Sequence, residues 1–300
     1  MRSSARSETP RGTVRLSAET TAVVLDSTAD LPDPAARHPN WRLVPLYVRF
    51  GDETLRDHVD LTAAEFYDRL RATSVQPATS QPTPGDFQEA FEALADFEHI
   101  VCITVSAKLS GTFESARLAA EAIGGGKVLL VDSASASAGI VILAESIQRR
   151  LSPGTSDDEI ESVAARFRRE ADLRFTVDTL DYLVRGGRIG KAAGLVGQLL
   201  NVKPILTIRE GEVEPVKRVR GRAKAFAEFE QALVSGSEDD PSWHLAVAHA
   251  DSQADADRIV AMIERVRPNA TLDLVTTLGP VVGTHGGPGT LGLFWFRDPT

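Results

Sequence analysis

Small hydroxyl-bearing residues follow three strand-like segments in the first half of the chain, at Asp26-Ser27-Thr28, Ser110-Gly111-Thr112 and Asp132-Ser133. Ligands of open parallel sheets bind at the carboxyl ends of the strands, so we expect these three segments to share one edge. Ser110-Gly111-Thr112 also precedes a predicted helix, whose unpaired N–H groups and dipole favour an anion. The pattern suits a carboxylate or phosphate, although the same residue types are ordinary helix N-caps.

Two further segments carry candidate polar groups. Thr79 and Ser80 precede Pro82 in a stretch that also holds Pro84 and Gly85, and we expect it to be irregular until a helix begins near Asp86. His285 lies in the glycine-rich stretch 279–290, where it could donate to a ligand oxygen or act as a base near neutral pH. The alternative interpretations are that Thr79 and Ser80 only form a turn, and that His285 is only a solvated loop residue.

Common catalytic motifs are absent. Gly190-Lys191 lacks the remainder of a P-loop, no GxGxxG follows the first strand, and Ser110 lacks the upstream glycine of a nucleophile elbow. The sequence has no HExxH or comparable spacing, so we predict no metal site. A Ser/His/acid triad that uses Ser110 and His285 stays open as an alternative.

A cationic cluster, 217–224, includes Arg218 and Arg220 and stands out in a chain of net negative charge. It is either a solvated corner between a strand and a helix or a docking patch for an acidic partner protein.

The elements that would position these residues differ between the two halves. The first half predicts strands at 21–25, 43–50, 100–105 and 127–131 alternating with helices, which is typical of a parallel sheet. The second half predicts strands at 174–177, 244–249 and 271–275 and an antiparallel pair within 204–213. Helices are expected at 62–71, 112–122, 157–170, from Gly190 to about Asn201, 222–234 and 255–266, before a glycine-rich tail.

We therefore expect an α/β protein of two α/β domains, the first with a parallel sheet and the second with a mixed or antiparallel sheet. The expected divisions are a disordered leader at 1–20, an N-terminal domain at 21–165 and a C-terminal domain at 166–300. A length of 300 residues is sufficient for two domains, each with its own core.

Composition excludes several classes. The 33 Lys+Arg and 42 Asp+Glu residues give a net charge of −9, which argues against nucleic acid as a partner. The single cysteine, Cys102, lies in an apolar run and is expected to be a packed core thiol. No apolar stretch approaches the ~20 residues of a membrane span and no secretory signal is evident, so a soluble, cytoplasmic protein is expected.

Taken in order, the motifs resemble those of the DegV family of bacterial fatty-acid-binding proteins. The resemblance runs from about Thr21 to Leu293 and rests on six segments: 26–32, 79–82, 109–112, 131–133, 186–189 and 283–289.

The resemblance implies a non-enzymatic carrier that buries one long-chain fatty acid, such as palmitate, at the domain junction, with no other cofactor. It implies that Thr79 and Ser110 hold the carboxylate, with Ser80, the Gly111 amide and His285 beside it. It also implies that the acid is presented to a separate ATP-dependent fatty-acid kinase in phospholipid metabolism. Contact with that kinase would be expected near three arginines, Arg188, Arg218 and Arg220. The rivals are a Ser/His hydrolase, an enzyme related to dihydroxyacetone kinases, and a lipid sensor with a different partner.

Overall fold

The first half of the chain is built on a parallel sheet. The computed structural model describes residues 15–124, 126–195 and 202–300. Four parallel strands lie in the order β2-β1-β6-β7: β1 Thr21–Asp26, β2 Trp41–Val44, β6 His99–Thr104 and β7 Val128–Asp132. Helices α3 (Pro84–Glu92) and α4 (Thr112–Ala122) pack on one face. The parallel sheet predicted for this half is confirmed.

The second half contains a mixed sheet of six strands in the order β10-β9-β8-β13-β11-β12, in which only β11 and β12 run parallel. Its strands are β8 Asp172–Thr176, β9 Val202–Arg209, β10 Glu212–Arg220, β11 Trp243–His249, β12 Thr271–Thr277 and β13 Leu291–Arg297. Helices α8 (Arg222–Gly236) and α9 (Gln253–Val266) cover one face. The mixed sheet expected here is confirmed, but its central strand β13 lies where only a glycine-rich tail was predicted.

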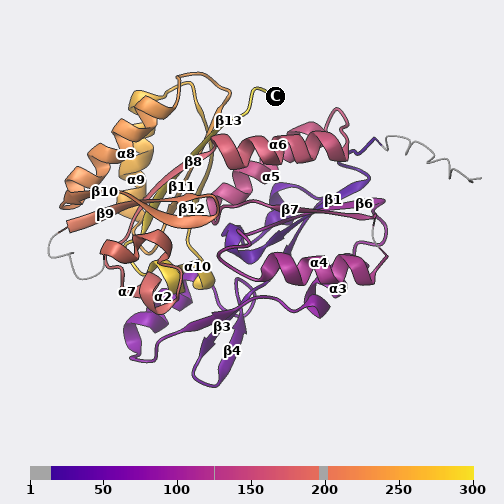
Figure 1. Ribbon diagram of the computed structural model, residues 1–300, viewed down its shortest axis with the longest axis horizontal. Helices are drawn as coiled ribbons and strands as arrows, with labels where there is room; N and C mark the ends of the chain where they lie inside the picture. Colours follow the sequence, from indigo (N-terminus) through magenta and orange to yellow (C-terminus); the bar gives the residue numbers. More distant parts are fainter. Residues whose placement is uncertain (1–14, 125, 196–201) are drawn as a thin grey trace, which may run out of the picture.

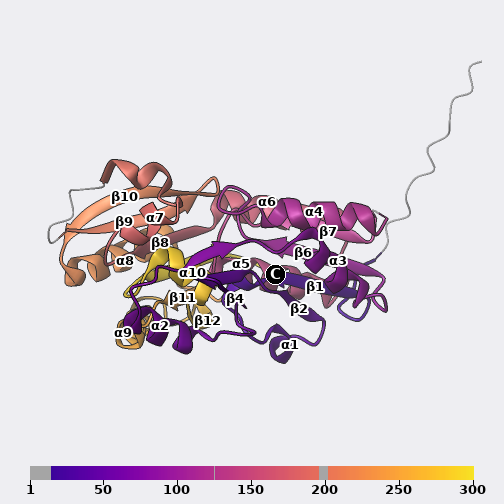
Figure 2. The same cartoon turned by 90° about the horizontal axis from the view of Figure 1, so that it is seen from below.

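Helix α5 (Ala138–Leu151) lies between the two sheets (Figures 1 and 2). Every residue from Ala138 to Ile147 is buried. The helix shares one hydrophobic core with Val23 and Leu25 of β1 on one side and with Phe294 and Phe296 of β13 on the other. Because one core serves both sheets, the two halves of the chain are not packed independently.

A smaller sheet of order β4-β3-β5 projects beside these layers (Figure 1). It contains β3 Tyr47–Phe50, β4 Glu53–Arg56 and β5 Ala78–Ser80. The single strand predicted at 43–50 is therefore wrong, because the chain leaves the parallel sheet at Pro45 and joins this one. The irregular loop predicted at Thr79 and Ser80 is also wrong, because these residues pair with β3.

The remaining helices are short or lie at the edges of the sheets. They are η1 Ser27–Ala29, α1 Pro34–Arg37, α2 Ala63–Ala72, α6 Asp157–Glu170, α7 Asp181–Arg185, η2 Gly190–Leu195 and α10 Pro280–Gly286. Helix α2, predicted at 62–71, begins with a capping box formed by Thr62 and Glu65. The helix expected from Gly190 to Asn201 begins as a 3₁₀ turn, and residues 196–201 lie outside the described part of the chain.

Residues 15–20, predicted to close the disordered leader, are ordered. Leu16 is buried, and its backbone exchanges hydrogen bonds of 2.8 and 2.9 Å with Thr155. The folded chain therefore overlaps the expected leader from this point, while residues 1–14 lie outside the described residues.

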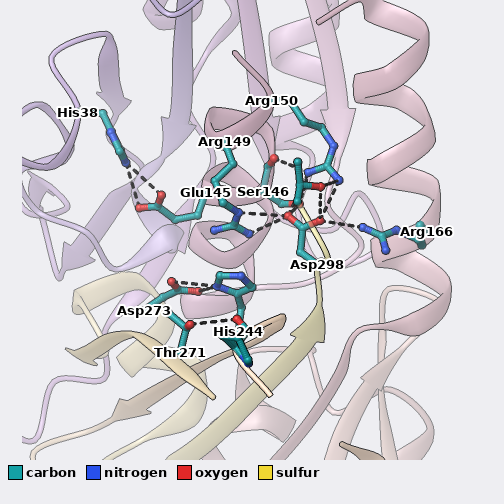
Figure 3. A network of polar contacts seen from close by, with 12 residues as sticks. His38, Glu145, Ser146, Arg149, Arg150, Arg166, His244, Thr271, Asp273 and Asp298 are labelled. Carbon is teal, nitrogen blue, oxygen red and sulfur yellow. Dashed lines mark hydrogen bonds and ion pairs between the residues drawn. The ribbon is translucent and has the colours of Figure 1, made fainter. Parts of the chain in front are cut away.

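A buried network of charges joins the end of β13 to α5 and α6 (Figure 3). The Asp298 carboxylate accepts from Arg149 at 2.8 Å, Arg150 at 2.8 Å and Arg166 at 3.0 Å. Burial alone would raise the pKa of Asp298, but hydrogen bonds from Arg150, Ser146 and Arg149 lower it well below its usual value. These contacts hold the last described strand against the central helices.

Candidate functional site

A cavity of about 170 Å³ lies between the two sheets. Both halves of the chain line it. Its apolar wall includes Leu46, Val105, Leu109, Ala136, Leu173, Phe175, Leu183, Ile208, Ala248, Val281 and Phe294. Its polar residues include Thr79, Ser80, Gln81, Ser110, Arg188 and His285.

Thr79 and His285 meet at this cavity although they are 206 positions apart, with Thr79 Oγ1 2.8 Å from His285 Nε2. Pairing with Val48 of β3 fixes Thr79 on β5. His285 lies in the last turn of α10, so the flexible loop predicted around it is wrong. Helix α10 contacts η1, α2, α7, β3 and β5, which positions the imidazole firmly.

The His285 imidazole is neutral at physiological pH. Burial is the main cause that lowers its pKa to about 4, and the positive charge of Arg188 adds to it. The Nδ1 atom is buried and has no hydrogen-bond partner among the described residues. It lies against Gly186, where a Cβ atom would come within 2.1 Å of Nδ1.

Ser110 and Gly111 precede α4 as predicted, and Ser110 lines the cavity. The Ser110 hydroxyl lies 2.8 Å from the Thr112 hydroxyl and accepts from the Thr112 N–H at 3.3 Å. Gly111 lies directly beneath the Gln81 amide, because a Cβ atom at Gly111 would come within 2.4 to 2.8 Å of it. Gln81 was not predicted as a site residue. Its only signal was its place beside Thr79 and Ser80 in one motif.

The three arginines expected near a partner occupy different places. Arg188 lines the cavity, where its Nε donates to the Leu109 carbonyl at 2.9 Å and its Nη1 to the Gly186 carbonyl at 2.7 Å. Arg218 and Arg220 lie exposed on β10 and do not line the cavity. Arg188 is therefore part of the cavity lining, whereas Arg218 and Arg220 lie apart from it.

Three other hydroxyls that line the cavity are engaged within the protein. Thr28 donates to the Asp26 carboxylate, Ser137 to the Asp30 carboxylate, and Thr290 to the Gly286 carbonyl. By contrast, neither the Ser80 hydroxyl nor the Gln81 amide has a side-chain hydrogen-bond partner within the described part of the chain. Among the described residues, the polar groups of the cavity without such a partner therefore include Ser80 of β5, Gln81 directly after it, and Nδ1 of His285 in α10.

The segment that begins at Asp26 and the one that leads to Ser110 share one edge as expected, because the Asp26 carboxylate accepts from the Val105 N–H at 2.6 Å. Asp26, Asp30 and Asp57 are buried. Burial raises the pKa of Asp26 to about 6 and that of Asp57 to about 7. Asp30 accepts from the Gly279 N–H at 2.7 Å, so this acidic cluster ties the first strand to the start of α10.

No Ser–His–acid triad is assembled among the described residues. The Nε2 atom of His285 pairs with Thr79 rather than with Ser110, and no carboxylate orients its Nδ1. The nucleophile and base of a hydrolase require the serine and the imidazole to be in hydrogen-bond contact. The described residues therefore do not place Ser110 and His285 as the nucleophile and base of a triad.

The pattern of the DegV family, described as "Uncharacterised protein, DegV family", matches residues 20–298. The chain belongs to the DegV family. It is similar to a DegV domain-containing protein of Halalkalibacterium halodurans, with 34% identity over 92% of this chain and 98% of that protein. It is also similar to a protein of Thermotoga maritima named fatty acid-binding protein, with 32% identity over 90% of this chain and 95% of that one.

Solved structures of DegV proteins share the fold of this chain. A DegV family protein of Thermus thermophilus, whose structure is described as fatty acid binding, superposes with a TM-score of 0.84. It is 36% identical over 93% of this chain and 99% of that one. The family resemblance inferred from six short motifs is thereby confirmed, and the α/β fold class with it.

Residues 15–124, 126–195 and 202–300 of this DegV chain contain no helix that is both long and apolar enough to cross a bilayer. They also contain no group of three or more His, Cys, Asp or Glu side chains placed to hold a metal ion.

Proposed function

We propose that this DegV chain binds one long-chain fatty acid in the cavity between its sheets, with the carboxylate at Thr79, Ser80, Ser110, the Gly111 N–H and His285. The observation that carries the proposal is a mostly apolar cavity whose polar side chains are grouped, with Thr79 in contact with His285 and Gln81 against Gly111. We call this group the polar end of the cavity. The similarity to proteins named for fatty acid binding supports it.

The apolar wall supplies enough free energy for such a ligand. Burial of a palmitate chain at ~0.8 kcal/mol per methylene contributes on the order of 12 kcal/mol before the costs of ordering and association. The polar end therefore only needs to orient the carboxylate.

The head group would be held mainly by neutral donors. With a proton on Nε2, His285 donates to Thr79 Oγ1 and leaves the Thr79 O–H free for a ligand oxygen. The Ser110 hydroxyl is placed to donate in the same way once it turns from Thr112. Such a site pairs the carboxylate less tightly than an arginine clamp would, which keeps it available for transfer.

The same arrangement suits a carrier that hands its ligand to another protein. Ser80 at the end of β5 and Gln81 directly after it are exposed, so the polar end of the cavity lies near the protein surface. We infer that a separate fatty-acid kinase forms the acyl phosphate there with ATP, as the family resemblance implies. Arg188, Arg218 and Arg220 are the candidate contacts with that kinase.

The first experiment is native mass spectrometry of the purified protein, followed by lipid extraction under denaturing conditions. About one equivalent of co-purified fatty acid supports the proposal and identifies the chain. An empty protein that also fails to take up added acid refutes it. Turnover of an ester or of ATP by the purified chain alone would instead favour the hydrolase or the dihydroxyacetone-kinase-like enzyme. A pull-down that captures no kinase-like protein would favour a lipid sensor.

The carboxylate assignment has its own test. Ser110→Ala should weaken fatty-acid binding by about 1–3 kcal/mol, because one donor to a charged group is lost. Ser133→Ala is the matched control, since Ser133 ends the neighbouring strand and does not line the main cavity. Equal affinities of the Ser110 variant and the wild-type protein would overturn the assignment.

A further inference from the structure

Three apolar side chains separate the main cavity from a second one of about 30 Å³. Ile208, Leu173 and Phe294 line both cavities. They come from three adjacent strands, β9, β8 and β13. The boundary between the cavities is therefore a wall that belongs to the sheet.

The strand register explains why these residues form one row. Phe294 is the direct partner of Leu173 in the antiparallel pair β13–β8. Between β8 and β9 Phe175 pairs with Leu206, and the same register, continued by two residues, brings Leu173 beside Ile208. Directly paired residues face the same side of a sheet, so the three side chains stand on the face that packs against α5.

Phe294 is the largest member of the row, and its ring fills the space between the sheet and α5. A Cβ atom at Gly139 of α5 would lie 3.2 Å from the ring, and one at Gly292 of its own strand 3.1 Å from it. Glycine at both positions leaves room for the aromatic ring. The ring thus closes the apolar end of the main cavity.

The second cavity has both polar and apolar walls. Ser133, Arg168 and Glu210 line it together with Ile142 and Trp295. An acyl chain that reached past the wall would therefore meet apolar as well as polar surface, and the wall itself is what keeps the chain from that space.

We propose that Phe294 sets the longest acyl chain that the cavity accepts, with Leu173 and Ile208 as the rest of the stop. This inference rests on the proposed fatty-acid binding and adds its chain-length specificity. A ligand whose carboxylate lies at Thr79 and His285 ends against this row. Removal of the ring extends the apolar path, and each further methylene that becomes buried increases affinity roughly fourfold.

The test measures dissociation constants for saturated fatty acids of about 14 to 22 carbons, because each methylene that becomes buried adds ~0.8 kcal/mol to the binding free energy. The wild-type protein is compared with Phe294→Leu and with Ile208→Ala, which opens the same wall at a half-buried position. Phe296→Leu is the matched control. Phe296 is a buried phenylalanine on the same face of β13 that lines neither cavity and packs on Phe167.

The expected result is a shift toward longer acids in both wall variants. For each protein we take the ratio of two affinities, that for the acid two carbons longer than the wild-type optimum and that for the optimum itself. This ratio should be at least tenfold higher in the wall variants than in the wild-type protein. The Phe296 variant should keep the wild-type profile. An unshifted profile in both wall variants, or an equal shift in the Phe296 variant, overturns the inference while fatty-acid binding stands. A wild-type protein that binds no acid of any length refutes the proposed function and this inference together.

Discussion

The carboxyl group of Asp57 should make the stability of the protein fall as the pH rises. Asp57 is fully buried, and its Oδ2 accepts from Ser27 at 2.7 Å while its Oδ1 has no partner among the described residues. Burial raises the pKa from 3.8 to about 7, His58 opposes this increase, and Asp30 adds to it. Between these two pKa values the folded protein holds a proton that the unfolded chain has released. The stability that this proton provides is therefore present below pH 4 and lost by about pH 7.

The magnitude follows from the size of the shift. A change of about 3 pKa units corresponds to ~4 kcal/mol of unfolding free energy. Asp57→Asn removes this titration and keeps the shape of the protonated side chain. The unfolding free energy of the variant minus that of the wild-type protein should therefore increase by ~3 kcal/mol between about pH 4.5 and 8.5, because the unfolded carboxyl is already mostly ionised at the lower limit.

The assay is urea unfolding of both proteins at several pH values within that range, which yields the free energy at each. Asp60→Asn is the control from the same turn. Asp60 is exposed, and hydrogen bonds from Arg56 lower its pKa to about 2, so it does not titrate within the range. Parallel stability curves for the wild-type protein and the Asp57 variant would refute the argument that the buried carboxyl is protonated in the folded state.

Two further substitutions test the site and the core. Gly186→Ala should weaken fatty-acid binding by about 1–3 kcal/mol in a titration, because its methyl group displaces His285 from Thr79; Gly85→Ala, where the methyl group meets only an ordinary contact, should bind like the wild-type protein. Asp298→Ala should lower the unfolding free energy in urea by about 3 kcal/mol, because three arginines lose a buried acceptor. An unchanged unfolding midpoint would show that water accepts hydrogen bonds from these arginines as well as the Asp298 carboxylate does.

Elements with a local signal could be predicted from the sequence. Helix α6 was predicted at 157–170, where an acidic first turn and a basic last turn mark its ends. The strands β1 and β6 are short apolar runs that end at polar residues, and they were predicted within a residue or two. Helix α5 gave no such signal, because a helix buried on all sides lacks the alternation of apolar and polar faces.

The meeting of the site residues could not be predicted from their spacing. Thr79 joins His285 only because β5 pairs with β3 and α10 folds onto them, and both pairings are non-local. The glycine-rich stretch concealed α10 and β13, since glycine and proline usually mark loops. Family motifs brought Thr79, Ser110 and His285 into one hypothesis, whereas the wall formed by Phe294 became visible only in the register of the sheet.

The place of β13 in its sheet has a consequence for biosynthesis. This strand is made after every other described strand, yet it lies between β8 and β11 and supplies Phe294 to the cavity. Until β13 has left the ribosome, the edges of β8 and β11 that it joins therefore stay unpaired, and α5 lacks its contacts with Phe294 and Phe296. If the proposed function holds, we expect a fatty acid to be bound only after release of the completed chain, when β13 closes the sheet and supplies Phe294 to the cavity.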